Sequence, residues 1–205
     1  GNLVFANASA QTYANVISGT GTIFNNASAD VTLSAANTFS GNVFLQAGKV
    51  IAGSNTALGT APIYQVSGLP STVDLNGRTL ANSFFLGGNG ASSAGAVTNG
   101  NATGATLTGA ISLTDNSLIK TDNSIGISGV ISGAYALSKS GSGNLTLSAA
   151  NTYTGATTLT GGTLSVATLA NGGLSSNLGA SSNAAANLVL DGGTLAYTGS
   201  AVSTD

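Results

Sequence analysis

The chain has 205 residues, enough for one substantial hydrophobic core, and a formal net charge of −2 at pH 7. Charged residues make up 5% of the sequence, where about 25% is usual, so salt bridges cannot organise this fold. Cysteine, histidine, methionine and tryptophan are absent, which removes the thiol nucleophiles and imidazole bases of most enzymes. We therefore expect neither enzymatic activity nor a bound metal or cofactor.

The four cationic side chains are scattered along the chain. They do not form the basic stripe that a nucleic acid backbone requires, so we expect no nucleic acid partner. No apolar run reaches the length of a transmembrane helix, and we expect no membrane insertion by this segment. The sequence begins without a charged and apolar leader, and any targeting parts are expected to lie outside it.

The first elements along the chain contain the word TLSAANT at 32–38, which returns at 146–152. A shift of 114 residues aligns Val16–Gly41 with Val130–Gly155 without a gap, and 13 of the 26 positions are identical. The match continues more loosely, so that the internal repeat covers residues 16–81 and 130–196. We interpret the chain as a tandem duplication within one continuous unit, residues 1–205, of a larger protein.

Short alternations of apolar and polar residues follow one another along both copies and predict strands of three to five residues. In the second copy the alternation predicts one buried face made of Leu145, Leu147, Leu164, Val166, Leu188, Leu190 and Leu195. Stretches such as AANT, GG, SGSG and GGNG separate the strands and are typical of turns. No segment has the length and composition of a helix, so the predicted class is all-β.

Short strands with one apolar face and small turn residues are typical of a single-stranded parallel β-helix, or β-solenoid. At about 20 residues per coil the chain would form about ten coils. A β-sandwich is the competing architecture. The solenoid is favoured because a sandwich core usually needs more than the 5% of aromatic residues found here.

The stretch Ala136–Ala167 closely resembles the autotransporter-associated β-strand repeat, also called the passenger-associated transport repeat. The first copy departs from the repeat pattern, with Asn25 in place of the lysine at Lys139 and alanines in place of two glycines. The resemblance rests above all on the following residues of the two copies, which we treat as the structural repeat positions: Leu33, Asn37, Thr38, Gly41, Leu147, Asn151, Thr152, Tyr153, Gly155, Gly162 and Leu164.

This resemblance implies a β-helical stalk or scaffold segment of a bacterial autotransporter-like protein that supports passenger export and folding. It implies an extracellular or cell-surface location, associated with the outer membrane through parts outside this chain. The repeat pattern brings no catalytic residues with it. Alternatives are an adhesin or glycan-binding module, a fibre-forming subunit that pairs with copies of itself end-to-end or laterally, and a β-helical carbohydrate-active enzyme.

Ser34 and Ser148 of the two TLSAANT words are conceivable nucleophiles, but the chain has no histidine to take their proton. A pair of Ser148 with Lys139 remains as a catalytic alternative. The structural interpretation is a corner in which Asn37 and Asn151 bond backbone groups in the adjacent coils.

Three further groups of residues are candidates for a metal site, a catalytic acid pair and a glycan-binding surface. Asp115 and Asp122 have oxygens that suit Ca²⁺, but they are expected on different corners of one coil. Asp74 and Arg78 are expected to form a cross-turn ion pair, since Asp74 has no second acid nearby in sequence for sugar cleavage. In the adhesin alternative, the polar flank or loops around residues 86–101 would hold glycans, and Tyr13, Tyr64, Tyr135 and Tyr197 would provide stacking platforms.

Overall fold

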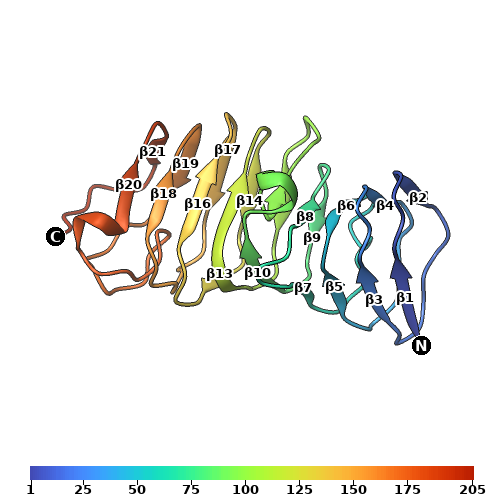
Figure 1. Ribbon diagram of the computed structural model, residues 1–205. Coiled ribbons are helices and arrows are strands. Elements are labelled where there is room, and N and C mark those ends of the chain that lie inside the picture. The colour runs from blue at the N-terminus through green and yellow to red at the C-terminus, as the bar shows by residue number, and fades with distance from the viewer.

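The computed structural model describes all residues from 1 to 205 and is a rod of short parallel strands with almost no helix (Figure 1). The termini lie at opposite ends of the rod. Every ladder between named strands is parallel, and each turn of the chain stacks on the previous one. This arrangement confirms the predicted β-solenoid.

The strands form three columns along the rod, which we call faces 1, 2 and 3. Face 1 consists of β1 (Asn2–Phe5), β3 (Thr22–Asn25), β5 (Val43–Leu45), β7 (Ile63–Gln65), β10 (Phe84–Gly88), the first part of β13 (Ile111–Lys120) and β15 (Ile131–Ser132). Because β13 is long and bends, it continues from face 1 into face 2 and joins both into one 15-stranded sheet.

The other two faces run beside it. Face 2 consists of β2 (Gln11–Tyr13), β4 (Val31–Leu33), β6 (Gly48–Ala52), β8 (Ser71–Asp74), β11 (Val97–Thr98), the second part of β13, β16 (Leu137–Ser140), β18 (Thr157–Leu159) and β20 (Leu188–Leu190). Face 3 is the six-stranded sheet of β9 (Thr79–Leu80), β12 (Ala105–Leu107), β14 (Ile125–Ile127), β17 (Asn144–Leu147), β19 (Thr163–Val166) and β21 (Thr194–Tyr197).

Most turns have the same length. Ile23 of β3 pairs with Val43 of β5, which lies one regular turn further along the chain. Two turns are longer: Phe84 pairs with Ile111, and Thr157 pairs with Leu188. The solenoid therefore has about eight turns, and the prediction of ten was too high because two loops interrupt the regular repeat.

These two loops contain the only helical turns of the chain. The loop after β10 includes the short 3₁₀ helix η1 (Ala91–Ser93) and covers the outer side of β8, while the loop after β19 includes η2 (Ala185–Asn187). No helix in this structure has the length and apolar character that crossing a membrane requires.

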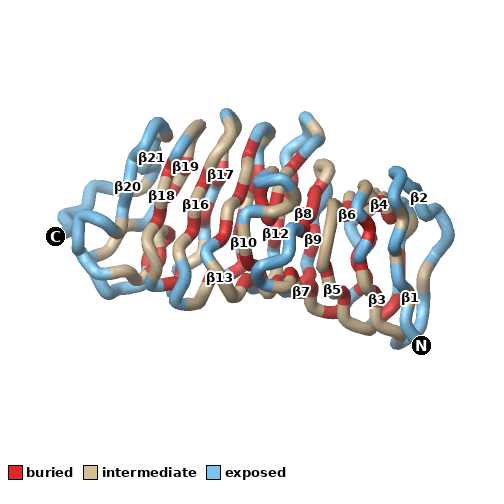
Figure 2. Tube along the Cα trace, viewed as in Figure 1, coloured by how far each residue is buried: buried red, intermediate tan, exposed pale blue.

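The core is one continuous cluster of 34 buried apolar residues along the rod axis (Figure 2). Alternate residues of each strand point inward, so inner positions are buried and outer positions are partly exposed, as in β4 and β5. Of the predicted buried face, Leu145, Leu147, Leu164 and Val166 are buried.

Leu188 and Leu190 differ from the prediction, because their exposed fractions are 40% and 56%. Both stand in β20, in the last turn of the rod, where β18 covers one side and no further strand covers the other. Leu195 of β21 is partly buried for the same reason. The alternation that places these residues inward is present, but a solenoid position is buried only when a turn stacks on each side.

Candidate functional site

The most distinctive polar positions are the corner asparagines of the two TLSAANT words. Asn37 accepts a hydrogen bond from the amide of Ile17 (2.8 Å) through Oδ1 and donates through Nδ2 to the carbonyl of Ala57 (2.7 Å). Ile17 lies 20 residues before Asn37 and Ala57 lies 20 residues after it. One buried side chain therefore connects three consecutive turns.

Asn151 makes the same pair of contacts in the second copy. Its Oδ1 accepts from the amide of Ile131 (2.8 Å), and its Nδ2 donates to the carbonyl of Asn177 (2.7 Å). The next residue continues the corner, since the amides of Thr38 and Thr152 donate to the carbonyls of Ile17 and Ile131. A buried amide that satisfies both a donor and an acceptor of neighbouring turns fixes how those turns align.

A second corner holds the lysine of the repeat pattern. Lys139 is buried, and its ammonium donates to the carbonyls of Ser140, Gly141 and Gly161 at 3.2, 3.1 and 2.8 Å. Burial lowers the pKa of Lys139 from its ordinary value, and the charge of Asp122 acts in the opposite direction. The three carbonyls replace the water that this ammonium loses on burial.

The first copy keeps one of these contacts with a different side chain. Asn25 occupies the position of Lys139, and its Nδ2 donates to the carbonyl of Ala47 (2.6 Å), which corresponds to Gly161 in the alignment of the two copies. The Oδ1 atom of Asn25 is buried without a hydrogen-bond partner. The degenerate copy therefore keeps the bond between turns and satisfies its corner less completely.

The glycines of the repeat are required by close backbone approach. A Cβ atom at Gly41 would overlap the carbonyl oxygen of Gly21, and one at Gly155 would overlap the backbone of Tyr135. Gly162 has φ of +60°, and its equivalent Gly48 has φ of +61°, a conformation that side chains disfavour. The remaining repeat positions Leu33, Leu147 and Leu164 point into the core.

Tyr153 and Thr157 form a buried pair, and both residues differ from their equivalents in the first copy. The Tyr153 hydroxyl group lies 2.7 Å from Oγ1 of Thr157, and both residues are buried. Their equivalents in the first copy are Phe39 and Val43, which are buried and have no hydroxyl groups. Each copy therefore leaves no unpaired hydroxyl at this position, one by pairing two and the other by having none.

The two copies occupy different faces of the rod. The column that starts at Ile23 of β3 passes through Val43, Ile63, Phe84 and Ile111 and reaches Ile131 of β15 after five turns. The equivalent of Ile23 in the second copy is not Ile131 but Leu137, which lies further along the chain. Leu137 belongs to β16, which stacks in the column of face 2.

The duplication therefore spans five turns plus one face. The first copy places its strands on faces 1 and 2, and the second places the equivalent strands on faces 2 and 3. The AANT corner correspondingly adjoins the column of face 3 in the first copy and that of face 1 in the second. The two copies share contacts between turns but face different directions around the axis.

The candidate nucleophiles do not meet a base. The hydroxyl groups of Ser34 and Ser148 each donate to a backbone carbonyl, of Tyr13 and Ile127 respectively, at 3.3 Å. The ammonium of Lys139 is occupied by three carbonyl groups and does not contact Ser148. The two serines also stand in different columns, because the two copies are rotated relative to each other.

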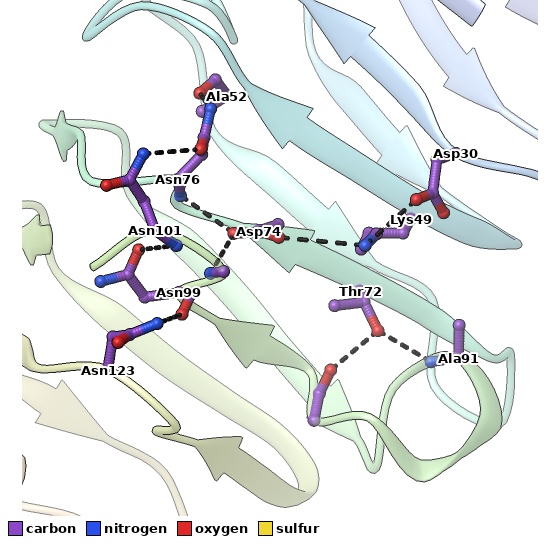
Figure 3. A network of polar contacts seen from close by, with 12 residues as sticks. Asp30, Lys49, Ala52, Thr72, Asp74, Asn76, Ala91, Asn99, Asn101 and Asn123 are labelled. Atoms are coloured by element: carbon purple, nitrogen blue, oxygen red, sulfur yellow. Dashed lines mark hydrogen bonds and ion pairs between the residues drawn. The ribbon is translucent and has the colours of Figure 1, made fainter. Parts of the chain in front are cut away.

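The predicted ion pair between Asp74 and Arg78 is wrong. Asp74 is buried and accepts hydrogen bonds from the amides of Asn76 (2.9 Å) and Gly100 (2.8 Å), while Arg78 forms no ion pair. The cation beside Asp74 is Lys49, whose Nζ lies 3.9 Å from Asp74 Oδ2 (Figure 3). The partner comes from the adjacent turn and is therefore distant in sequence.

Lys49 also brings a second acid to the same place. Its Nζ lies 3.1 Å from Oδ2 of Asp30, so two carboxylates flank one ammonium on face 2 (Figure 3). Asp30 is 44% exposed at its side chain, whereas that of Asp74 is 8% exposed. This arrangement is a surface ion-pair network in which the backbone already occupies the inner carboxylate.

Asp115 and Asp122 do not converge. Asp115 accepts from the Ser67 hydroxyl (2.7 Å), and Asp122 lies 3.3 Å from the ammonium of Lys120. The structure contains no group of three or more acidic, histidine or cysteine side chains arranged to hold a metal ion.

An outward row of aromatic rings on face 1 was not anticipated. Phe24, Phe44, Tyr64 and Phe85 stack on consecutive turns, with centroid distances of 5.3, 4.9 and 4.5 Å and interplanar angles of at most 21°. The recurrence of aromatic residues at nearly constant intervals is the sequence signal that would have found them. Because neighbours cover both faces of the Tyr64 ring, that ring is no open platform for a sugar.

The other candidate tyrosines and the loop residues are dispersed. Tyr13, Tyr135 and Tyr197 are 37%, 42% and 37% exposed and lie in separate turns. In the region 86–101, the loop with η1 packs against β8, where Thr72 donates to the carbonyl of Gly95. A cavity of about 410 Å³ lies instead at the C-terminal end of the rod, lined by the loop after β19, Leu188 and Leu195.

The fold and these corners define a repeat protein of the parallel β-solenoid class, in which the recurring polar residues bond one turn to the next. A comparison with known families supports this class: the model described as passenger-associated-transport-repeat matches residues 28–52 and 137–166. No curated protein and no solved structure matches the chain. The chain thus contains two regions that match the passenger-associated transport repeat, a match that suggests an autotransporter passenger segment and implies a secreted or cell-surface protein.

The corner asparagines lead to a first prediction. Asn151→Ala leaves the buried amide of Ile131 and the carbonyl of Asn177 without partners, so we expect the free energy of unfolding to fall by about 3 kcal/mol. Asn37→Ala should have a similar effect. Urea denaturation followed by circular dichroism measures both, with Asn26→Ala as the matched control, since Asn26 is exposed and its side chain forms no hydrogen bond. Equal stability of the Asn151 and Asn26 variants would refute this role.

The hydroxyl pair leads to a second prediction. Tyr153→Phe and Thr157→Val each leave one buried hydroxyl group unpaired and should each cost about 1–2 kcal/mol, whereas the double variant reproduces the Phe39 and Val43 pair and should cost less than the sum. A double-mutant cycle by urea denaturation measures the coupling. Additive effects would show that the hydrogen bond contributes nothing.

The same tyrosine predicts a pH dependence. Burial raises the pKa of Tyr153 to about 12, and the hydrogen bond with Thr157 acts in the opposite direction. An unfolded tyrosine loses its proton near pH 10 while Tyr153 keeps it, so this residue contributes a loss of stability as the pH rises from 10 toward 12. Unfolding measured across this range should show a smaller loss for Tyr153→Phe than for the unmodified chain.

Proposed function

We propose that this segment is a non-enzymatic scaffold that forms part of the stalk of an autotransporter passenger and supports its folding during export. The main support for this proposal is that the polar side chains of the repeat form hydrogen bonds within the rod. Asn37, Asn151 and Lys139 are buried, and all direct their hydrogen bonds to backbone groups of their own and neighbouring turns. The polar groups of these three side chains therefore hold adjacent turns together.

The residues suited to catalysis support the same conclusion. Ser34 and Ser148 donate to carbonyls without a neighbouring base, and the inner carboxylate of the acid pair on face 2 is held by two backbone amides. A hydrolytic pair needs one carboxyl group that changes its protonation during the reaction. In Asp74 both oxygens already have partners in the chain, since Oδ1 accepts from two amides and Oδ2 lies beside the ammonium of Lys49.

Export support follows from the way the rod is built. Each turn presents a complete parallel strand edge on which the next turn forms its hydrogen bonds, so a chain that emerges gradually can fold turn by turn on the part already formed. The asparagine corners select the alignment of each new turn. In this proposal the link to the outer membrane is made by parts of the protein outside this chain.

The scaffold proposal predicts that corner residues matter more for display than exposed ones. In a complete passenger displayed on cells, Asn37→Ala with Asn151→Ala should reduce the amount of protease-resistant passenger several-fold. Serine replacements of Tyr13, Tyr135 and Tyr197 should leave display unchanged, because these side chains are exposed and the fold does not depend on them. Surface labelling after brief protease treatment measures both sets.

The adhesin alternative gives a different result in the same cells. If the segment binds glycans, the serine replacements should abolish binding to a glycan array while display stays normal. A scaffold gives no array signal before or after replacement. Sedimentation of the purified segment separates the remaining alternative, since a fibre-forming subunit sediments as a concentration-dependent assembly.

A further inference from the structure

The chain contains four asparagines that are each followed by glycine: Asn76, Asn89, Asn99 and Asn171. This dipeptide is prone to spontaneous deamidation because glycine has no side chain to shield its amide nitrogen. The nitrogen must reach Cγ of the asparagine, so the reaction needs a free asparagine side chain and a glycine N–H that is not engaged in a hydrogen bond. The four sites differ sharply in both respects.

Asn99 is protected at every atom. Its side chain is fully buried, Nδ2 donates to the carbonyls of Thr103 and Ser124, and Oδ1 accepts from the amides of Gly77 and Asn101. The amide of the following glycine, Gly100, donates to Oδ1 of Asp74 (2.8 Å). The side chain of Asn99 and the amide of Gly100, which would react with each other, are therefore both engaged in hydrogen bonds to other residues; Figure 3 shows part of this network.

Asn76 is protected through the same network. Its Nδ2 donates to the carbonyl of Ala52 (3.1 Å), and its Oδ1 accepts from Nδ2 of Asn101 (3.3 Å). The amide of Gly77 donates to Oδ1 of Asn99 (2.9 Å). Reaction at this site requires breaking three contacts between adjacent turns.

Asn171 is exposed, but its glycine is engaged, because the amide of Gly172 donates to Oδ1 of Asp205 (2.8 Å). Asn89 is the remaining site. It is exposed, its side chain forms no hydrogen bond, and the amide of Gly90 has no acceptor. It lies at the start of the loop with η1, next to Gly88, where an added Cβ would meet only open space.

From this contrast we propose that Asn89 is a site of spontaneous deamidation in the folded protein and the fastest-reacting of the four asparagine–glycine pairs. The nitrogen of Gly90 attacks Cγ of Asn89, and the side-chain nitrogen leaves as ammonia with the proton of the Gly90 amide, forming a cyclic imide. Water then opens the ring. Cleavage at Cγ gives aspartate, and cleavage at the original peptide carbonyl gives isoaspartate.

The modification would change the outer surface of the rod in one place. It adds one negative charge to a chain whose net charge is −2, beside the loop that covers β8. Isoaspartate also lengthens the backbone by one atom at the point where the carbonyl of Asn89 accepts from Gly95 (2.8 Å). A long-lived surface protein would accumulate this acidic form with age.

The four basic residues make the test convenient. Trypsin cleaves after Lys49, Arg78, Lys120 and Lys139, so Asn89 and Asn99 fall within the same peptide, residues 79–120. After incubation of the folded chain at mildly alkaline pH, fragment-ion mass spectrometry should place the conversion at Asn89 and leave Asn99 unmodified. An isoaspartyl methyltransferase assay should label the same peptide.

Two comparisons make the result decisive. In urea, all four sites should react at similar rates, because the protection is structural. In the folded chain, Asn89→Gln should remove the fastest acidic species, and Thr72→Val, which loses the hydrogen bonds to Ala91 and Gly95, should accelerate reaction at Asn89 but not at Asn99. Conversion of Asn99 or Asn76 as fast as Asn89 in the folded chain, or no conversion at Asn89, would overturn the proposal.

Discussion

The structure depends on one constraint: each turn of backbone lies directly on the previous turn, at the spacing of about 4.8 Å between hydrogen-bonded strands. In the strands the ladder satisfies the backbone groups, but at the corners it is interrupted, as at the amides of Ile17 and Ile131, which bond a side chain instead of a carbonyl. The corners must therefore supply their own donors and acceptors or have no side chain at all. Asn37 and Asn151 meet the first requirement, and Gly41 and Gly155 meet the second.

The same constraint explains why the repeat tolerates some changes and not others. Lys139 and Asn25 differ in size and charge, yet each donates to the equivalent carbonyl 22 residues further along the chain. Tyr153 and Thr157 are exchanged together for an apolar pair. What persists between the copies at the Lys139 position is the donation to the carbonyl of the next turn, while the side chain that donates varies and Oδ1 of Asn25 is left without a partner.

Because the second copy is rotated by one face about the rod axis, the two copies present different outer surfaces. Since the duplicated length exceeds five turns by one face, equivalent outer positions point in different directions. The outer positions of face 1 carry the aromatic row in the first half, while the equivalent strands β16 and β18 carry Ser138 and Thr158 on face 2. The repeat therefore builds a continuous rod in which the contacts between turns recur and the outer surfaces do not.

Much of this fold could be predicted from the sequence because its determinants are local. The alternation around Leu145 and Leu147 indicated strands with one buried face, and both residues are buried. Stacking between turns was harder to foresee, because it joins residues that are a whole turn apart in sequence. Proximity in sequence predicts Arg78 as the partner of Asp74, whereas its actual partner Lys49 lies in the adjacent turn.

The number of turns and the offset between the two copies were also hard to predict, because both depend on the lengths of loops. Two long loops reduce the number of turns, and one of them, the loop after β10, lies between the two copies and contributes to the offset of the second copy by one face. Neither the number of turns nor this offset follows from local periodicity. The aromatic row was not predicted because its members lie a whole turn apart in the sequence. Once the length of a regular turn is known, Phe24, Phe44 and Tyr64 can be assigned to equivalent positions of consecutive turns.

Disulfide mapping tests the rotated solenoid most directly, because the natural chain has no cysteine. In the rotated solenoid Ser138 lies beside Leu118, its strand partner on face 2, and away from Ser112 of face 1. Cysteines introduced at 118 and 138 should therefore form a disulfide readily under mild oxidation, and cysteines at 112 and 138 should remain reduced. The reverse result would mean that both copies occupy the same faces, and would contradict the account.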